Sequence, residues 1–223
     1  MNRILTIYLV VISLFQLTAQ DKMIVDKPFN GNTYYGSCSE HINSISGLPS
    51  VIQYNIKGYL QRILGTMSDS VEFSHGQVVD LKKYFALDSA TYEYGWIVPH
   101  YDVNFILRDN SIGIKSYYLQ LSLDEFGQIL QSNWPTNHYS DKSTFKSRSE
   151  IEKYALKEAN YYGIRTDDYQ VDLSYNQKLD ILCWVFKFPL SVEPNRKEYY
   201  VYEIDWNSIE IIDEYNIMSI TTY

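Results

Sequence analysis

The side chains of this chain that could carry acid–base chemistry are few and widely spaced. No two of its four histidines stand at the spacing that metal ligands need. His100 and Asp102 lie two residues apart, so on a strand they would share one face, and the carboxylate could orient the imidazole for proton transfer. The same spacing is typical of a structural histidine, since any two such residues share a face. The histidines are His41, His75, His100 and His138.

Nucleophilic chemistry has little support in the sequence. Cys183 could act as a thiol nucleophile beside a histidine, but its neighbours Leu182 and Trp184 are apolar, and apolar surroundings raise the pKa of a thiol. The sequence contains none of the motifs of serine hydrolases, zinc peptidases, phosphate-binding loops or calcium loops. It therefore predicts no catalytic residue, no metal site and no cofactor, and we expect a protein that is not an enzyme.

The two cysteines, Cys38 and Cys183, also allow a structural role. In an exported chain such a pair is compatible with one disulfide, which would stabilise the fold by up to about 5 kcal/mol. The alternative is two free thiols, with Cys183 buried in a strand. Both interpretations stay open, because a disulfide requires a geometry that spacing along the chain does not show.

The first residues have the layout of a bacterial secretory signal peptide. Arg3 supplies the positive charge, residues 4–17 are mostly apolar, and Ala19 precedes the expected cleavage site before Gln20. The apolar run is shorter than the roughly 18 residues that a membrane span needs, although an uncleaved anchor is the alternative. We expect a secreted or periplasmic protein with residues 1–19 as signal peptide and no membrane span after cleavage.

Composition excludes some partners and suggests others. Loss of Arg3 with the leader changes the formal charge from −8 to −9 (−8 − 1), and basic residues form no stripe, so we expect no binding to nucleic acid. The 22 tyrosines indicate strands with one face half exposed, or alternatively an aromatic surface for glycan or peptide. The candidate ligand-binding rings are Trp96, Trp134, Tyr139 and Trp206.

The first half of the chain predicts one helix followed by strands. Residues 20–47 are rich in Asn, Gly and Ser and predict an irregular segment. Apolar residues at three- and four-residue steps predict a helix from Pro49 to Leu64. Residues 71–85 are ambiguous and suggest two short strands around a turn at Gly76, then the start of a helix at Lys82. The later strands are predicted at 101–107, 117–123 and 128–131.

The second half predicts the same order more clearly. Residues 136–146 are polar and predict a linker. Ser147 and Glu150 match a capping box at the start of a helix, and Gly163 is placed to end that helix in the left-handed conformation. Four strands closely linked by turns must be antiparallel, so a helix packed on an antiparallel meander is expected. The strands are predicted at 170–175, 179–188, 199–205 and 209–217.

Two stretches about 81 residues apart repeat one pattern. Residues 115–130 and 196–211 each form an alternating strand that ends in Asp, then a short turn, then a second apolar strand. Asp124 and Asp205 are expected to form the turns, because Asp accepts hydrogen bonds from backbone amides two residues on. We therefore expect a duplicated α+β fold, with a divergent first unit at 48–135 and a second unit at 147–223.

The second unit resembles the PepSY domain and PepSY-like modules of the cystatin type. Residues 155–163 match the glycine-terminated helix end, residues 184–188 the central strand, and residues 200–205 with 210–211 the closing motif. The family pattern has glycine just before the final acidic-apolar pair, where this chain has Ile209. In the first unit Gly127 is kept, but the turn is one residue shorter.

The resemblance implies an exported, non-catalytic module, since such domains are associated with peptidase propeptides and proposed peptidase inhibition. The leading hypothesis is therefore a binding module built from two PepSY-like units, with a peptide or a peptidase as partner. The alternative is a glycan- or surface-binding envelope protein that uses the exposed aromatic residues named above. An enzyme with an unrecognised site and a purely structural envelope component remain further hypotheses.

Overall fold

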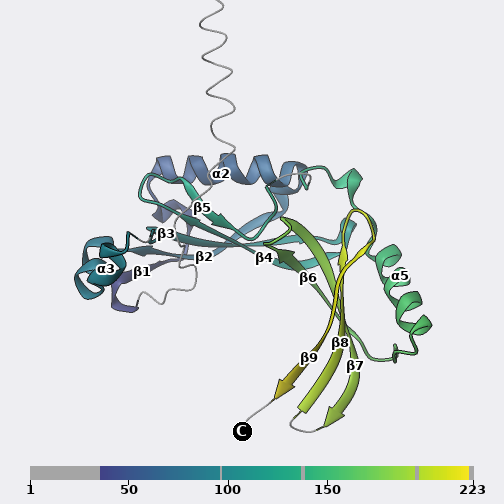
Figure 1. The fold of residues 1–223 in the computed structure, drawn as a ribbon. Helices are drawn as coiled ribbons and strands as arrows, with labels where there is room; N and C mark the ends of the chain where they lie inside the picture. The colour runs from purple at the N-terminus through teal and green to yellow at the C-terminus, as the bar shows by residue number, and fades with distance from the viewer. Residues whose placement is uncertain (1–35, 96, 137–138, 194–195, 221–223) are drawn as a thin grey trace, which may run out of the picture.

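The computed structural model describes residues 36–95, 97–136, 139–193 and 196–220. It confirms an α+β fold: a five-stranded antiparallel sheet in the order β1-β2-β3-β4-β5 and a four-stranded antiparallel sheet in the order β6-β7-β8-β9 (Figure 1). The predicted signal peptide and its cleavage site lie outside the described residues. Within the described residues, no helix has the length and apolar character that crossing a membrane requires.

The second sheet follows the prediction closely. Helix α5 (Arg148–Tyr161) begins with the predicted capping box of Ser147 and Glu150 and is followed by Gly163 at φ 72°. Its strands are β6 (Gln170–Asn176), β7 (Ile181–Glu193), β8 (Arg196–Asp205) and β9 (Ile211–Ile220). β7 and β8 are longer than predicted. Pro189 is accommodated in β7 beside a bulge, because proline lacks the amide hydrogen that a regular ladder uses.

The first sheet departs from the prediction at β2. Val71–Val79 is a single strand, β2, whereas two strands around a Gly76 turn were expected. Gly76 lies inside this strand because a Cβ atom there would come within 2.9 Å of the Asp102 carbonyl oxygen on the neighbouring strand. The glycine therefore permits close packing of strands, and this finding corrects the expectation of a turn at Gly76.

The remaining elements surround this strand. α2 (Ser50–Leu64) is the predicted helix, and a further strand, β1 (Ser39–Ile42), forms within the segment expected to be irregular. Asp80 caps α3 (Leu81–Leu87), which is the helix suggested near Lys82. The other elements are α4 (Ser89–Glu93), β3 (Tyr101–Asp109), β4 (Ile114–Leu123), β5 (Ile129–Ser132) and the 3-10 helices η2 (Gly36–Cys38), η3 (Ile45–Gly47), η4 (Gly65–Ser70), η5 (Asn110–Ile112) and η6 (Lys142–Thr144).

One hydrophobic core joins the two sheets. A single cluster of buried residues takes in α2, the first sheet, α5 and the second sheet. The segment 136–146, predicted as a linker, contributes to it through Tyr139, which is 3% exposed. Lys142 of the same segment forms an ion pair with Asp109, whose side chain is 7% exposed. The connection is therefore a packed part of the structure.

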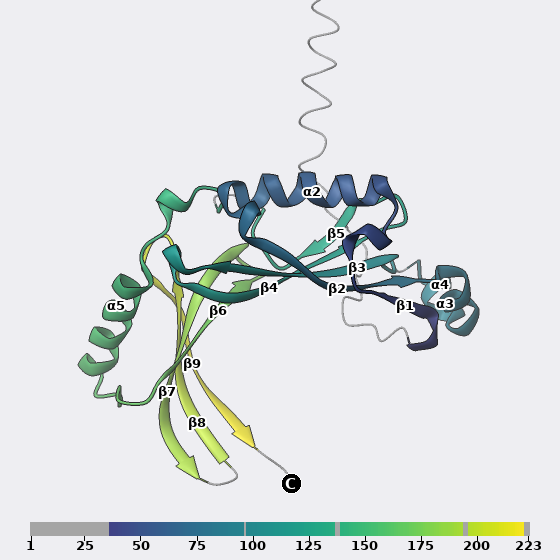
Figure 2. The same cartoon turned by 180° about the vertical axis from the view of Figure 1, so that it is seen from behind.

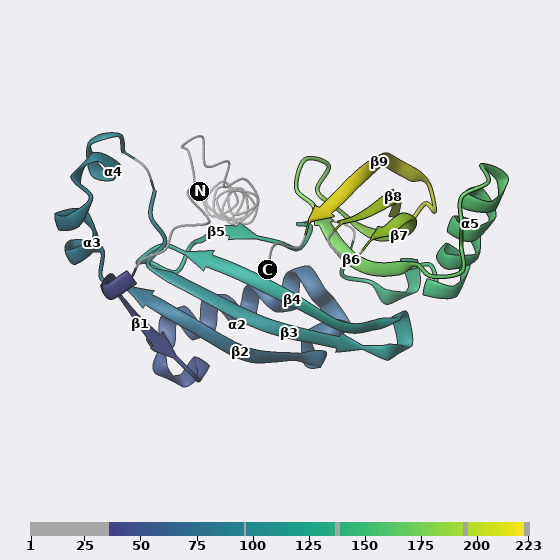
Figure 3. The ribbon, with the colours of Figure 1, turned by 90° about the horizontal axis from the view of Figure 1, so that it is seen from below.

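Each sheet carries a helix on one face. α2 covers the first sheet and α5 the second, and the second sheet descends from one end of the first, so that their helix-free faces enclose an angle (Figures 1 and 2). Figure 3, seen from below, looks onto the helix-free face of the first sheet, with α3 and α4 at one end and the second sheet at the other. We call the angle between these two faces the inside corner.

Candidate functional site

The aromatic rings proposed as a binding surface are buried, which corrects that expectation. Trp134 and Trp206 are 0% exposed and Tyr139 is 3% exposed, while Trp96 lies outside the described residues. The indole of Trp134 donates to the Ile63 carbonyl at 3.2 Å. These rings fill the core between the two sheets, so they cannot form a surface patch for glycan.

Trp206 shows why the core captures these residues. Its ring stacks on Phe145 at a centroid distance of 4.4 Å and meets Trp184 edge-on at 5.4 Å. Its indole N–H donates to the Lys146 carbonyl at 2.9 Å. Burying a tryptophan with its polar N–H satisfied is strongly stabilising, and a turn next to a sheet junction offers such a position.

The two cysteines are both buried and free, so the structure favours the free-thiol alternative over the disulfide. Cys38 packs with Val79, Tyr84 and Val98 beside the first sheet, whereas Cys183 lies on β7 of the second. Burial raises the pKa of the Cys183 thiol to about 12, with smaller contributions from nearby carboxylates. A thiol in this environment stays protonated at neutral pH and is a poor nucleophile.

His100 and Asp102 do not form an acid–base pair among the described residues. Asp102 is 7% exposed. Its carboxylate accepts hydrogen bonds from the Ser122 hydroxyl and from the side-chain Nε2 of Gln77, the latter at 3.2 Å. Neighbouring strands therefore engage both carboxylate oxygens. The Nδ1 atom of His100 is buried and has no hydrogen-bond partner in the described part of the chain, and its ring lies edge-on to Tyr101 at a centroid distance of 4.4 Å.

A shallow depression beside His100 has no assembled catalytic or metal centre. Its volume is about 380 Å³. Three carboxylates line it, but no group of three or more His, Cys, Asp or Glu residues in the described ranges has an arrangement that could hold a metal ion. The lining residues are Glu40, Val78, Val79, Asp80, Leu81, Lys82, His100 and Glu125.

The helix-free face of the first sheet is polar. Strand alternation sends one set of side chains toward α2 and the other set to this face. Asp102, Ser122 and Gln77 form a hydrogen-bonded group on it. Toward the second sheet, Arg108 and Glu72 form an exposed ion pair at 2.7 Å. Asp102 and Ser122 are only 7% and 2% exposed, so the open part of this face lies toward the second sheet.

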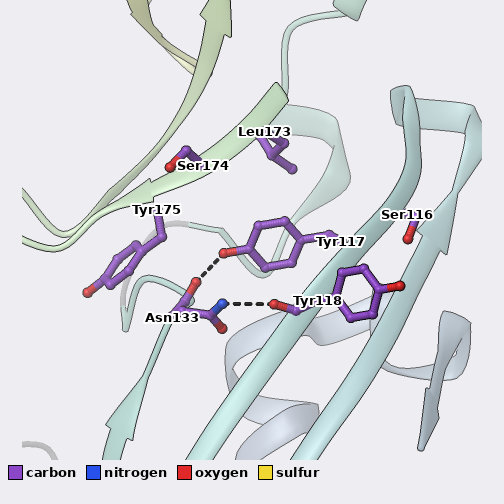
Figure 4. A pocket seen from close by; sticks show the side chains of 7 residues that line it. All are labelled: Ser116, Tyr117, Tyr118, Asn133, Leu173, Ser174 and Tyr175. Carbon is purple, nitrogen blue, oxygen red and sulfur yellow. Dashed lines mark hydrogen bonds between the residues drawn. The ribbon is translucent and has the colours of Figure 1, made fainter. Parts of the chain in front are cut away.

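A second depression, of about 360 Å³, lies at the inside corner (Figure 4). Tyr118 presents a ring that is 62% exposed, and the hydroxyls of Ser116 and Ser174 are on exposed residues. The Asn133 side chain is bonded to the backbone of β4. Its Nδ2 donates to the Tyr118 carbonyl at 2.8 Å, and its Oδ1 accepts from the backbone N–H of Gln120 at 2.7 Å. The lining residues are Ser116, Tyr117, Tyr118, Asn133, Leu173, Ser174 and Tyr175.

Two strand edges lie at this corner. β5 pairs with β4 only over Leu121–Leu123, so within the described residues the stretch 114–120 of β4 has no strand on that side. Among the described strands, β6 pairs only with β7 and is therefore an edge strand of the second sheet. On β4, Asn133 already bonds the Gln120 N–H and C=O and the Tyr118 C=O, so the part of this edge before Tyr118 is the part that an added strand could pair with. The edge of β6 can pair with an added strand in the same way.

The sequence did not indicate these corner residues, although one signal was available. In Tyr117–Tyr118, strand alternation requires one ring to point to the core and the other to the opposite face. The structure buries Tyr117 and exposes Tyr118. Ser116, Asn133 and Ser174 carry no comparable signal, because polar residues on strands and turns are common.

Comparison with protein-family models, with curated proteins and with solved structures finds no match to this chain.

Proposed function

We propose that this protein is a non-catalytic binding protein that holds an extended peptide segment at the inside corner. The observation that carries the proposal is the meeting of two incompletely paired strand edges, β4 and β6, at one depression. An extended peptide pairs its backbone with such an edge and places alternate side chains in adjacent depressions. Tyr118 offers a flat apolar surface to one of these side chains.

The groups at the corner suit a neutral stretch of peptide. The residues that line the depression are serines, tyrosines, an asparagine and a leucine, with no charged side chain among them. Hydroxyl and amide groups can donate and accept hydrogen bonds with a peptide backbone. The depression is shallow and open to solvent, which fits a peptide laid along a surface better than a small substrate enclosed for catalysis.

The proposal includes export and a peptidase as the source of the peptide. Support for export comes from the signal-peptide layout of residues 1–19. Support for a peptidase comes from the resemblance of the second unit to PepSY-like modules. A peptidase partner would present an extended segment, which is the form of chain that a strand edge binds.

A displayed peptide library tests this function. We expect peptides that bind the mature chain to lose about tenfold in affinity with Tyr118→Ala, because an aromatic contact contributes about 1.4 kcal/mol. Ser174→Trp should also weaken binding by filling the depression. Tyr54→Ala is the matched control, since Tyr54 is 77% exposed but lies on α2, on the opposite side of the first sheet.

A panel of secreted and envelope peptidases tests the partner separately. We expect at least one peptidase to be inhibited, or to form a complex that Ser174→Trp disrupts. Selection of peptides that bind the Tyr118→Ala and Tyr54→Ala variants equally would reject the corner as the site. An oligosaccharide array is the further comparison: selective binding of glycans that depends on Tyr118 would assign the corner to glycan instead of peptide.

A further inference from the structure

The second sheet has an open edge on the side away from β6. β9 (Ile211–Ile220) forms this border, and among the described strands it pairs only with β8. Its later part runs away from α2 and the first sheet (Figures 1 and 2). Residues 213–216 and 218–219 are exposed, and Ile217 is half-buried. Backbone N–H and C=O groups on an edge of this kind can pair with another chain.

The hydrogen bonds of β8 show which backbone groups of β9 point outward. The Asp205 N–H donates to the Glu210 carbonyl at 2.9 Å, whereas the Trp206 N–H donates toward β7, to the Leu182 carbonyl at 3.1 Å. Backbone groups alternate in direction along a strand, so the odd-numbered residues of β8 face β9. Their β9 partners, the odd-numbered residues from 213 to 219, face β8 in return. The groups that point to the open edge therefore belong to the even-numbered residues, namely Glu214, Asn216, Met218 and Ile220.

This edge lacks the features that usually prevent strands from pairing between molecules. Such features are short strands, proline, lysine and bulges. The edge strands of the first sheet, β1 and β5, have four residues each. Residues 214–220 of β9 contain no proline or lysine, and the β8–β9 bulge lies before them, beside Glu203 and Ile204. Pairing with one symmetric partner closes such an edge, whereas unsymmetric pairing leaves it open to aggregation.

We propose that β9 pairs antiparallel with β9 of a second copy about a two-fold axis at Ile217, so that the two four-stranded sheets become one continuous sheet. In this register Asn216 pairs with Met218 of the second copy, and Glu214 pairs with Ile220 of the second copy. All four outward-facing residues are then used, which gives about eight backbone hydrogen bonds across the axis. Ile217 lies opposite its own copy as a non-hydrogen-bonded pair.

The charges along the edge favour a second copy in this orientation. Asp213 and Glu214 lie at the start of the exposed stretch, and the remaining residues of β9 carry no charge. Lys197 of β8 lies beside the other end, opposite Ser219 and on the same face as Asp213. Two-fold symmetry brings the acidic start of one β9 toward Lys197 of the other copy and places no two carboxylates directly opposite each other. This surface is independent of the proposed function, which uses the edges of β4 and β6.

Sedimentation velocity of the mature protein tests the association, over about 1–200 μM and at roughly 0.15 M salt to screen general charge repulsion. We expect a monomer–dimer equilibrium with a Kd on the order of 10 μM, since a strand-edge interface is small. Met218→Pro removes an outward N–H that β8 does not use, so it should fold normally and raise the Kd about tenfold or more. Met218→Thr keeps this N–H and should dimerise within about threefold of the natural chain. A protein that stays monomeric overturns the proposal and leaves the edge to a different partner, and a dimer that Met218→Pro leaves intact overturns it as well.

A charge reversal tests the orientation of the two copies. Lys197→Glu places a carboxylate near Asp213 of the second copy, and we expect it to raise the Kd about threefold or more. Lys157→Glu is the matched control, since it changes the net charge equally at an exposed position on α5 and should leave the Kd unchanged. Equal effects of the two variants would show that the charges at the edge do not orient the pair.

Disulfide formation tests the register. Ile217→Cys should link two copies on oxidation, because residues in a non-hydrogen-bonded antiparallel pair have Cα atoms about 4.5 Å apart, within the range of a disulfide. Tyr215→Cys and Ser219→Cys should each stay unlinked alone and should link when the two proteins are mixed, because the register places them opposite each other. The native Cys38 and Cys183 are buried, so the natural chain is the unlinked control. Failure of Ile217→Cys to link in a sample that dimerises overturns the register at Ile217.

Discussion

The turns after Asp124 and Asp205 begin in the same way and end differently. The Asp124 carboxylate accepts from the backbone N–H groups of Phe126 and Gln128 at 2.9 and 2.8 Å. The Asp205 carboxylate accepts from the amides two and three residues further on, at 2.7 and 2.6 Å. Both aspartates therefore form turns, as the sequence predicted. The residues that close the turns, Gly127 and Ile209, differ because their surroundings differ.

Gly127 closes the first turn against helix α2. Its φ is 82°, and a Cβ atom there would lie 2.8 Å from both Asn55 Nδ2 and Ile52 Cδ1. The Asn55 amide donates to the Gly127 carbonyl at 3.3 Å. A side chain here is disfavoured mainly by the left-handed backbone conformation, and the ends of the Asn55 and Ile52 side chains would have to shift to make room for it.

Ile209 closes the second turn with a φ of 59°, in the left-handed region that β-branched residues rarely adopt. This conformation costs about 1–3 kcal/mol. The Ile209 side chain packs against the central core, beside a turn that also places Trp206 in that core. The comparison shows that a strained turn residue is tolerated where its side chain contributes to packing, and that glycine suits a left-handed turn residue that faces a helix.

The largest test of this comparison is Trp206→Ala. Trp206 follows Asp205 and is 0% exposed, whereas Glu125 follows Asp124 and is exposed. We expect Trp206→Ala to lower the free energy of unfolding by about 3–5 kcal/mol, because it removes a buried ring and its hydrogen bond. Glu125→Ala should change it by less than about 0.5 kcal/mol. Denaturant unfolding of both variants measures the difference, and similar losses would mean that the two turns do not differ in burial.

The next test is Gly127→Ala. The added methyl group meets Asn55 and Ile52, and alanine disfavours the left-handed backbone, so we expect a loss of about 2 kcal/mol or more. Gly58→Ala is the control, because Gly58 lies in α2 with nothing within 4 Å of the added Cβ. That change should stabilise by about 0.5–1 kcal/mol through helix propensity. If Gly127→Ala leaves the free energy of unfolding unchanged, α2 and the turn do not pack this closely in solution.

A smaller effect is expected from the two aspartates. Asp205→Ala should cost about 2 kcal/mol and Asp124→Ala about 1 kcal/mol, since each leaves two amides without an acceptor and Asp205 is more buried, at 8% exposed. Thermal and denaturant unfolding of the two variants gives the ratio. A larger loss for Asp124→Ala than for Asp205→Ala would indicate that burial of the aspartate does not set its contribution to the free energy of unfolding. Asn at either position should restore part of the loss, because its oxygen still accepts.

The smallest effect is expected from Ile209→Gly. Glycine removes a strain of about 1–3 kcal/mol, and this gain offsets the loss of a half-buried isoleucine, which is on the order of 1–2 kcal/mol. The net change should therefore stay within about 1 kcal/mol, measured by the same denaturant unfolding. A loss clearly above 2 kcal/mol would show that the side-chain packing of Ile209 outweighs its backbone strain.

Local patterns predicted much of the second sheet. The capping box at Ser147, the glycine after α5 and the four strands are all set by contacts between residues close in the chain, so the sequence displays them. β1 was not predicted, because a four-residue edge strand gains its structure from pairing with β2. Gly76 was assigned to a turn for a related reason, since the strand that approaches it is distant in sequence.

The candidate sites were harder to predict than the fold. Trp134 and Trp206 belong to a residue type that is common at binding surfaces. The structure buries both in the core between the two sheets, and this burial depends on how the sheets meet. The corner depression combines Ser116, Tyr117 and Tyr118 of β4 with Leu173, Ser174 and Tyr175 of β6, and these two groups lie more than fifty residues apart in the chain.

The sequence by itself determined helices α2 and α5, the capping box of α5, the alternation of the strands and the role of Asp124 and Asp205 in the turns. These features depend on hydrogen bonds and side-chain periodicity within a few residues. The tertiary structure alone decided which of Tyr117 and Tyr118 is buried, and that Ile209 must adopt a left-handed backbone. Burial and strain depend on contacts between distant segments, because the free energy of packing is gained only where those segments meet.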